Sequence, residues 1–101
     1  MACTSYDEVI DALYKGIIAS ATTAHETQYD RGVFDAYAEA YSEVCDARVR
    51  NGGLSVAHAY IEAWADAIFN QFEEWGNSSE HLCAMNNTAR VILTSLTKWL
   101  D

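Results

Sequence analysis

Histidines and carboxylates are the residues of this chain with the potential for metal or acid–base chemistry. His58 and Glu62 stand four residues apart, and Glu39 and Glu43 repeat that spacing. Each pair would share one face of a helix, which makes a single carboxylate-rich metal site conceivable. A ferritin-like di-iron site needs Glu-x-x-His pairs on two facing helices, and the sequence has no such pair. We therefore expect no bound metal, no cofactor and no catalytic centre.

The other two histidines carry weaker signals. His25-Glu26 begins like the metalloprotease motif His-Glu-x-x-His, but Tyr29 stands where the second histidine is required. His81 follows Glu80 at the start of a predicted helix, where an exposed or hydrogen-bonded imidazole is the ordinary expectation. The histidines thus predict no enzyme.

Cysteines and glycines give no catalytic signature either. Cys3, Cys45 and Cys83 are odd in number, widely spaced and without a Cys-x-x-Cys pair, which disfavours a disulfide framework and favours Cys45 and Cys83 as small buried hydrophobic residues. Neither GxxxxGK[ST] nor GxGxxG occurs, so nucleotide hydrolysis is not supported. The sequence predicts a protein that is not an enzyme.

Acidic side chains dominate the charge pattern. The chain has 15 Asp and Glu against 6 Lys and Arg, a formal net charge of −9. This disfavours direct binding to nucleic acid or anionic membrane, because such binding releases counter-ions to a cationic surface. Two rows of carboxylates at helical spacing are the candidate partner-binding residues: Asp35, Glu39, Glu43 and Asp46, then Glu62, Asp66, Glu73 and Glu74. These carboxylates repel one another, so the sequence favours one of two roles for them: conferring solubility or binding a cationic partner.

Helices must position these residues, because proline is absent and apolar residues recur at helical spacing. We expect helices at about 6–21, 24–50, from Ser55 to Gly76, and from 77 or 79 to the C-terminus. Their predicted N-terminal signals are the capping boxes Ser5–Glu8 and Thr23–Glu26, then Ser55, and then Asn77 or Ser79. Gly32 is expected to weaken or kink the second helix, and a break near 29–32 is the alternative.

Short connections between these helices favour antiparallel neighbours. The predicted fold is therefore all-α, a compact up-and-down four-helix bundle forming a single domain over 1–101. An irregular helical cluster is the alternative.

The last predicted helix differs from the others because Arg90 and Lys98 are its only charged residues before Asp101. It is expected either to be the most buried helix or to offer a face to a twofold partner, which makes a homodimer possible. Its predicted outer positions are Asn86, Asn87, Thr88, Thr94, Ser95 and Thr97. Tyr29, Tyr37 and Tyr41 lie in the same segment as the first acidic row, a composition suited to a protein interface.

No apolar run approaches the roughly 20 residues of a membrane span, and no basic segment precedes an apolar one near the N-terminus. We expect a cytoplasmic protein.

In size, acidity and all-helical make-up, the chain resembles the small phage-encoded inhibitors of bacterial defence, particularly anti-CRISPR proteins. The likeness covers the whole chain and involves no motif, so no functional residue is carried over. It implies a stoichiometric protein that binds a CRISPR effector complex in the host cytoplasm and blocks recruitment or cleavage of DNA. Carboxylates about 6 Å apart along a helix would then imitate a line of phosphates in a cationic groove.

The alternative function is a structural or regulatory helical module that acts by self-association or by docking a partner helix. Its acidic faces would only confer solubility. The two hypotheses differ in salt dependence and in whether an apolar surface stays exposed after the helices pack.

Overall fold

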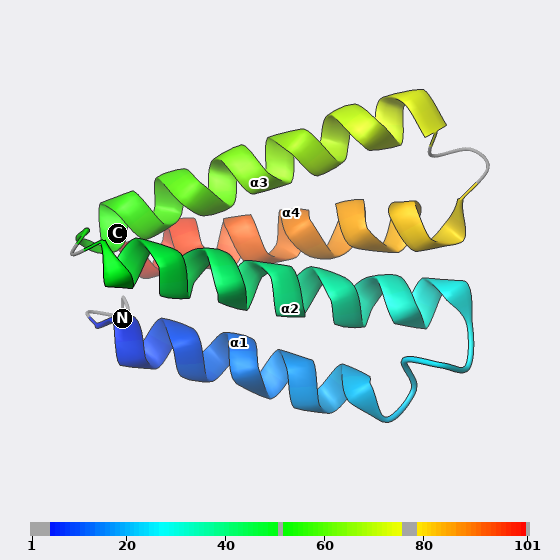
Figure 1. Ribbon diagram of the computed structural model, residues 1–101, viewed down its shortest axis with the longest axis horizontal. Helices are drawn as coiled ribbons and strands as arrows, with labels where there is room; N and C mark the ends of the chain where they lie inside the picture. The colour runs from blue at the N-terminus through cyan, green and yellow to red at the C-terminus, as the bar shows by residue number, and fades with distance from the viewer. Residues whose placement is uncertain (1–4, 51, 76–78, 101) are drawn as a thin grey trace.

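The computed structural model describes residues 5–50, 52–75 and 79–100. Residues 98–100 are described by their backbone alone. Four helices make up nearly all of this part of the chain: α1 (Tyr6–Ala21), α2 (Gln28–Val49), α3 (Leu54–Trp75) and α4 (Glu80–Leu100). They run alternately in opposite directions, side by side (Figure 1). The predicted all-α four-helix bundle is confirmed.

Helix α2 is the centre of the packing. It contacts α1, α3 and α4, whereas α1 packs almost entirely on α2 and barely reaches α3 or α4. The core is built from the apolar stripes of all four helices, and its largest fully buried side chains are Val9, Val44, Ile61 and Leu96. Because α1 has a single main partner, the side of the bundle between α1 and α4 is less completely packed.

The start of α2 differs from the prediction. The Thr23–Glu26 capping box is not used: residues 22–26 form a turn, and α2 begins at Gln28 instead of 24. Thr27 is the N-cap, and its hydroxyl accepts a hydrogen bond from the Asp30 amide at 3.0 Å. Ser5 is confirmed as the N-cap of α1, since its hydroxyl accepts a hydrogen bond from the amide of Glu8.

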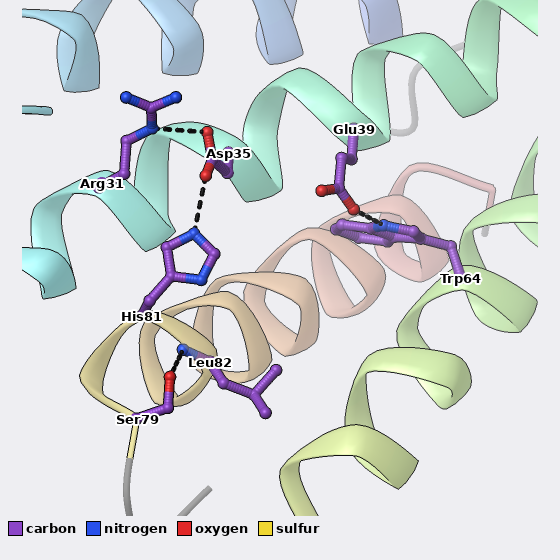
Figure 2. Close-up of polar contacts among 7 residues, drawn as sticks. All are labelled: Arg31, Asp35, Glu39, Trp64, Ser79, His81 and Leu82. Atoms are coloured by element: carbon purple, nitrogen blue, oxygen red, sulfur yellow. Dashed lines mark hydrogen bonds and ion pairs between the residues drawn. The ribbon is translucent and has the colours of Figure 1, made fainter. Parts of the chain in front are cut away.

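The prediction of Ser55 as a cap is wrong. Helix α3 begins one residue earlier, and the Gly53 carbonyl accepts hydrogen bonds from the amides of Val56 and Ala57. The α4 cap is Ser79, whose hydroxyl accepts from the Leu82 amide at 3.1 Å (Figure 2). The alternative cap Asn77, the predicted stop at Gly76, and Cys3 lie outside the described residues.

Gly32 neither breaks nor ends α2, which runs unbroken through it. A Cβ at this position would lie 2.4 Å from the His81 carbonyl oxygen and 2.7 Å from the Ala84 Cβ. The glycine therefore permits the close approach of α2 and α4, a tertiary requirement that outweighs the low helix propensity of glycine.

Two residues of α4 predicted as outer are buried. Asn86 is 5% exposed and Thr88 is 8% exposed, whereas Asn87, Thr94 and Thr97 are exposed as predicted and Ser95 is half-buried. The reason is that α4 packs on both α2 and α3, which covers a wider arc of the helix than one apolar stripe. Helix α4 is thus covered on two sides, by α2 and by α3, and keeps an exposed face that includes Val91.

Candidate functional site

The first acidic row lies along one face of α2. In an α-helix the positions of Asp35, Glu39, Glu43 and Asp46 span an arc of about 80° and an axial length of about 16 Å. Glu39 and Asp46 are exposed, and Asp35 and Glu43 are half-buried. We call these four residues the α2 acidic row. Its members differ in whether another side chain binds their carboxylate.

Asp35, at one end of the row, is neutralised inside the molecule. Its carboxylate receives a hydrogen bond from the Arg31 guanidinium at 3.0 Å and lies 2.7 Å from Nε2 of His81 on α4. Figure 2 shows the carboxylate between these two side chains. Asp35 therefore joins α2 to α4 and offers little free charge to a partner.

Glu39 is held by α3. The buried Trp64 indole donates a hydrogen bond from Nε1 to the Glu39 carboxylate at 2.9 Å (Figure 2). An indole N–H buried without an acceptor costs about 1–3 kcal/mol, so Glu39 stabilises the contact between α2 and α3 while staying exposed.

Glu43 and Asp46 are the uncompensated part of the row. Neither forms an ion pair or a side-chain hydrogen bond with any described residue. Desolvation raises the pKa of Glu43 above its ordinary value, and the negative charges of Asp46 and Glu39 raise it further. Neighbouring negative charges therefore lie together here although desolvation and mutual repulsion both disfavour the ionised Glu43 carboxylate.

The second acidic row does not join the first. Glu62, Asp66 and Glu73 lie between about 160° and 180° around the α3 axis from Trp64, which faces α2 and binds Glu39. Asp66 instead lines a hollow beside α4. Glu74 is exposed at the end of α3, away from this arc. The carboxylates of α2 and α3 thus form two separate surfaces.

Within the described part of the chain, the histidines and cysteines do not gather into a site. The His58 ring lies 2.9 Å from the Thr97 hydroxyl on α4, whereas Glu39 on α2 accepts a hydrogen bond from Trp64 on α3. His58 and Glu39 therefore point to different partners, and the metal site considered from the sequence is not assembled. Among the described residues no group of three His, Cys, Asp or Glu side chains is arranged to hold a metal. Cys45 and Cys83 are free and half-buried, less buried than predicted, and His25 is exposed in the turn before α2.

A groove lined by both apolar and polar side chains lies on the opposite side of α2, where α1 and α4 make little contact. Tyr37 lines three adjoining hollows there, of about 300, 170 and 170 Å³. Their walls come from Gly16 and Ala19 on α1 and from Val91 on α4, which is 58% exposed. We call this the Tyr37 groove. Among the described residues, Asp30 is the one charged residue that lines any of these three hollows.

Comparisons with known proteins add no assignment: no family model, no curated protein and no solved structure matches the chain significantly. None of the helices in the described part of the chain combines the length and apolar character that crossing a membrane requires. The case for function therefore depends on the surfaces themselves.

Proposed function

We propose that this chain is a non-enzymatic acidic binding protein that occupies a cationic, nucleic-acid-binding surface of a protein partner through the α2 acidic row. The observation that supports the proposal is the pair Glu43 and Asp46. These carboxylates lie side by side without an internal counter-ion among the described residues, and desolvation together with like charge raises the pKa of Glu43. Repulsion that the fold does not relieve is relieved when lysine or arginine of a partner covers the row.

The partner class follows from the charge. A chain of net charge −9 associates fastest with a strongly cationic groove, because long-range attraction raises the rate of encounter. The resemblance to anti-CRISPR proteins makes a CRISPR effector complex, met in the host cytoplasm during phage infection, the first partner to test.

The test compares two neutralised variants of equal charge. Glu43→Gln/Asp46→Asn removes two negative charges from the α2 row, and Glu73→Gln/Glu74→Gln removes two from the exposed end of α3. Glu39 is left intact because removing its carboxylate would also disturb Trp64. Each protein is titrated against a panel of purified effector complexes carrying labelled target DNA.

We expect the wild type to displace DNA from one member of the panel and the α2 variant to do so at least tenfold less well, since a charge-assisted hydrogen bond contributes about 1.5–3 kcal/mol. The α3 variant should mainly slow association, because it alters only the long-range field. Equal losses in both variants, or no displacement by the wild type, would refute the proposal.

A second candidate function is self-association through the Tyr37 groove, favoured by the exposure of Val91 at its edge. The occupant in this case is a second copy of the chain. Two copies repel least where the surface is nearly uncharged, and the groove is such a surface. Sedimentation of the wild type and of Val91→Glu tests this: a concentration-dependent dimer that the variant abolishes supports it, and a monomeric wild type excludes it.

A further inference from the structure

A separate hollow between α3 and α4 has no part in the proposed function. It has a volume of about 280 Å³ and is lined by Ala65, Asp66, Phe69, Asn86, Arg90 and Leu93. Its walls therefore combine a carboxylate, a guanidinium and a carboxamide with apolar side chains. The volume is close to the lower end of the range for small-molecule sites, about 300–1,000 Å³.

Asn86 is the unusual member of this set. It is 95% buried, since only 5% is exposed, yet its side chain forms no hydrogen bond with any residue that the structure describes. No fully enclosed side-chain nitrogen or oxygen lacks a partner in this part of the chain, so the Asn86 amide keeps its small accessible surface toward the hollow that it lines. Buried amides are nearly always hydrogen-bonded to protein or to water, so the Asn86 amide, which has no partner among the described residues, is available to a polar group that enters the hollow.

Arg90 also has no polar partner among the described residues. Its guanidinium carbon lies 5.1 Å from the centre of the Phe69 ring, and it makes no ion pair with a described carboxylate, although Asp66 lines the same hollow. Lys15, Arg31 and Arg48, by contrast, are each paired with an aspartate. Stacking on Phe69 orients the guanidinium and leaves its N–H groups available.

We propose that this hollow binds a free α-amino acid with an apolar side chain. Its carboxylate accepts hydrogen bonds from Arg90 and from the Asn86 amide, which lie one helical turn apart on α4. Its ammonium group faces Asp66 on α3, and its side chain lies against Ala65 and Leu93. Opposite charges on the two walls fit a zwitterion, whereas a simple anion would be repelled by the net charge of −9.

The experiment is a titration of the ¹⁵N-labelled chain, followed by NMR, with L-leucine, 4-methylpentanoate or 3-methylbutylamine. The last two probes keep the apolar body but carry only the carboxylate or only the ammonium group. We expect L-leucine to cause saturable shifts at the amides of 65–69 and 86–93. The single-charge probes should bind at least about tenfold more weakly, because each lacks one charged hydrogen bond. No saturable shift, or equal binding of one analogue, would overturn the assignment.

Three variants complete the test. Arg90→Gln and Asn86→Leu should each weaken leucine binding at least about tenfold, while Arg50→Gln, the same charge change at an exposed position outside the hollow, should not. Asn86→Leu should keep or raise the melting temperature, since it removes an unpaired buried amide; a purely structural asparagine predicts a fall. Arg90 is exposed, so its variant folds and remains decisive: leucine binding unaffected by Arg90→Gln excludes the site.

Discussion

Neutralising Glu43 should stabilise the protein while weakening the proposed interaction. Desolvation raises the pKa of the Glu43 carboxylate most, and the charges of Asp46, three residues after it, and Glu39, four residues before it, raise it further. Each like-charge pair at such spacing costs about 0.2–0.5 kcal/mol, so Glu43→Gln should add about 0.4–1 kcal/mol to the free energy of unfolding at pH 7 and low salt. In a domain of this size that gain corresponds to about 2–8 °C in melting temperature.

The sign of the pH dependence follows from the direction of the pKa shift. Because the folded state raises the Glu43 pKa above its ordinary value of 4.5, it binds that proton more tightly than the unfolded chain does. The stability contributed by Glu43 is thus fully present below the unfolded pKa and is lost as pH rises through the folded pKa. Urea unfolding of wild type and Glu43→Gln at several pH values measures the difference. A variant less stable than the wild type at pH 7, or a difference that does not shrink on acidification, would refute the reasoning.

Three further predictions concern the architecture, and circular dichroism during urea unfolding measures each. Thr27→Ala should lose about 0.5–2 kcal/mol as a cap is removed, whereas Thr23→Ala should stay within about 0.5 kcal/mol of wild type; equal losses would contradict the observed start of α2. Gly32→Ala should lose about 1–2 kcal/mol, because overpacking against a backbone carbonyl exceeds the gain in helix propensity. Gly16→Ala should lose less, because the added Cβ meets a tyrosine ring that borders open hollows; the reverse order would show that these contacts do not decide the outcome. Tyr6→Phe should lose about 0.5–1.5 kcal/mol, since the Tyr6 hydroxyl lies 2.7 and 2.8 Å from the Gly52 and Gly53 carbonyl oxygens. An unchanged stability would show that these hydrogen bonds do not stabilise the fold.

Much of the fold was predictable from local signals, and the errors show where such signals end. Apolar spacing located all four helices, and the Ser5 box located the start of the first one. At the start of α2 two equivalent signals compete, because Thr23 and Thr27 each have an acidic residue three positions later. Local sequence does not distinguish them. The choice of Thr27 over Thr23 follows from the turn at 22–26, which brings α1 and α2 side by side, and so depends on the packing of the two helices.

The candidate site was predictable only in part, for a similar reason. Helical spacing alone placed four carboxylates on one face of α2. It had no means to show that Asp35 meets His81, 46 residues away, or that Glu39 meets Trp64, 25 residues away. Burial of Asn86 was equally hidden, because a polar residue beside an apolar stripe is expected to be exposed unless a second neighbouring helix covers it.

The separation of the acidic surfaces limits what a partner can do. A cationic groove that seats the α2 row leaves Glu62 and Asp66 on the far side of α3, while Asp35 is already compensated by Arg31. The contact charges are then chiefly Glu43 and Asp46, with a share of Glu39. The whole net charge of −9 speeds association with such a partner, but only a few contacts slow dissociation of the complex. A tight inhibitor with this architecture therefore needs apolar contact beside the row.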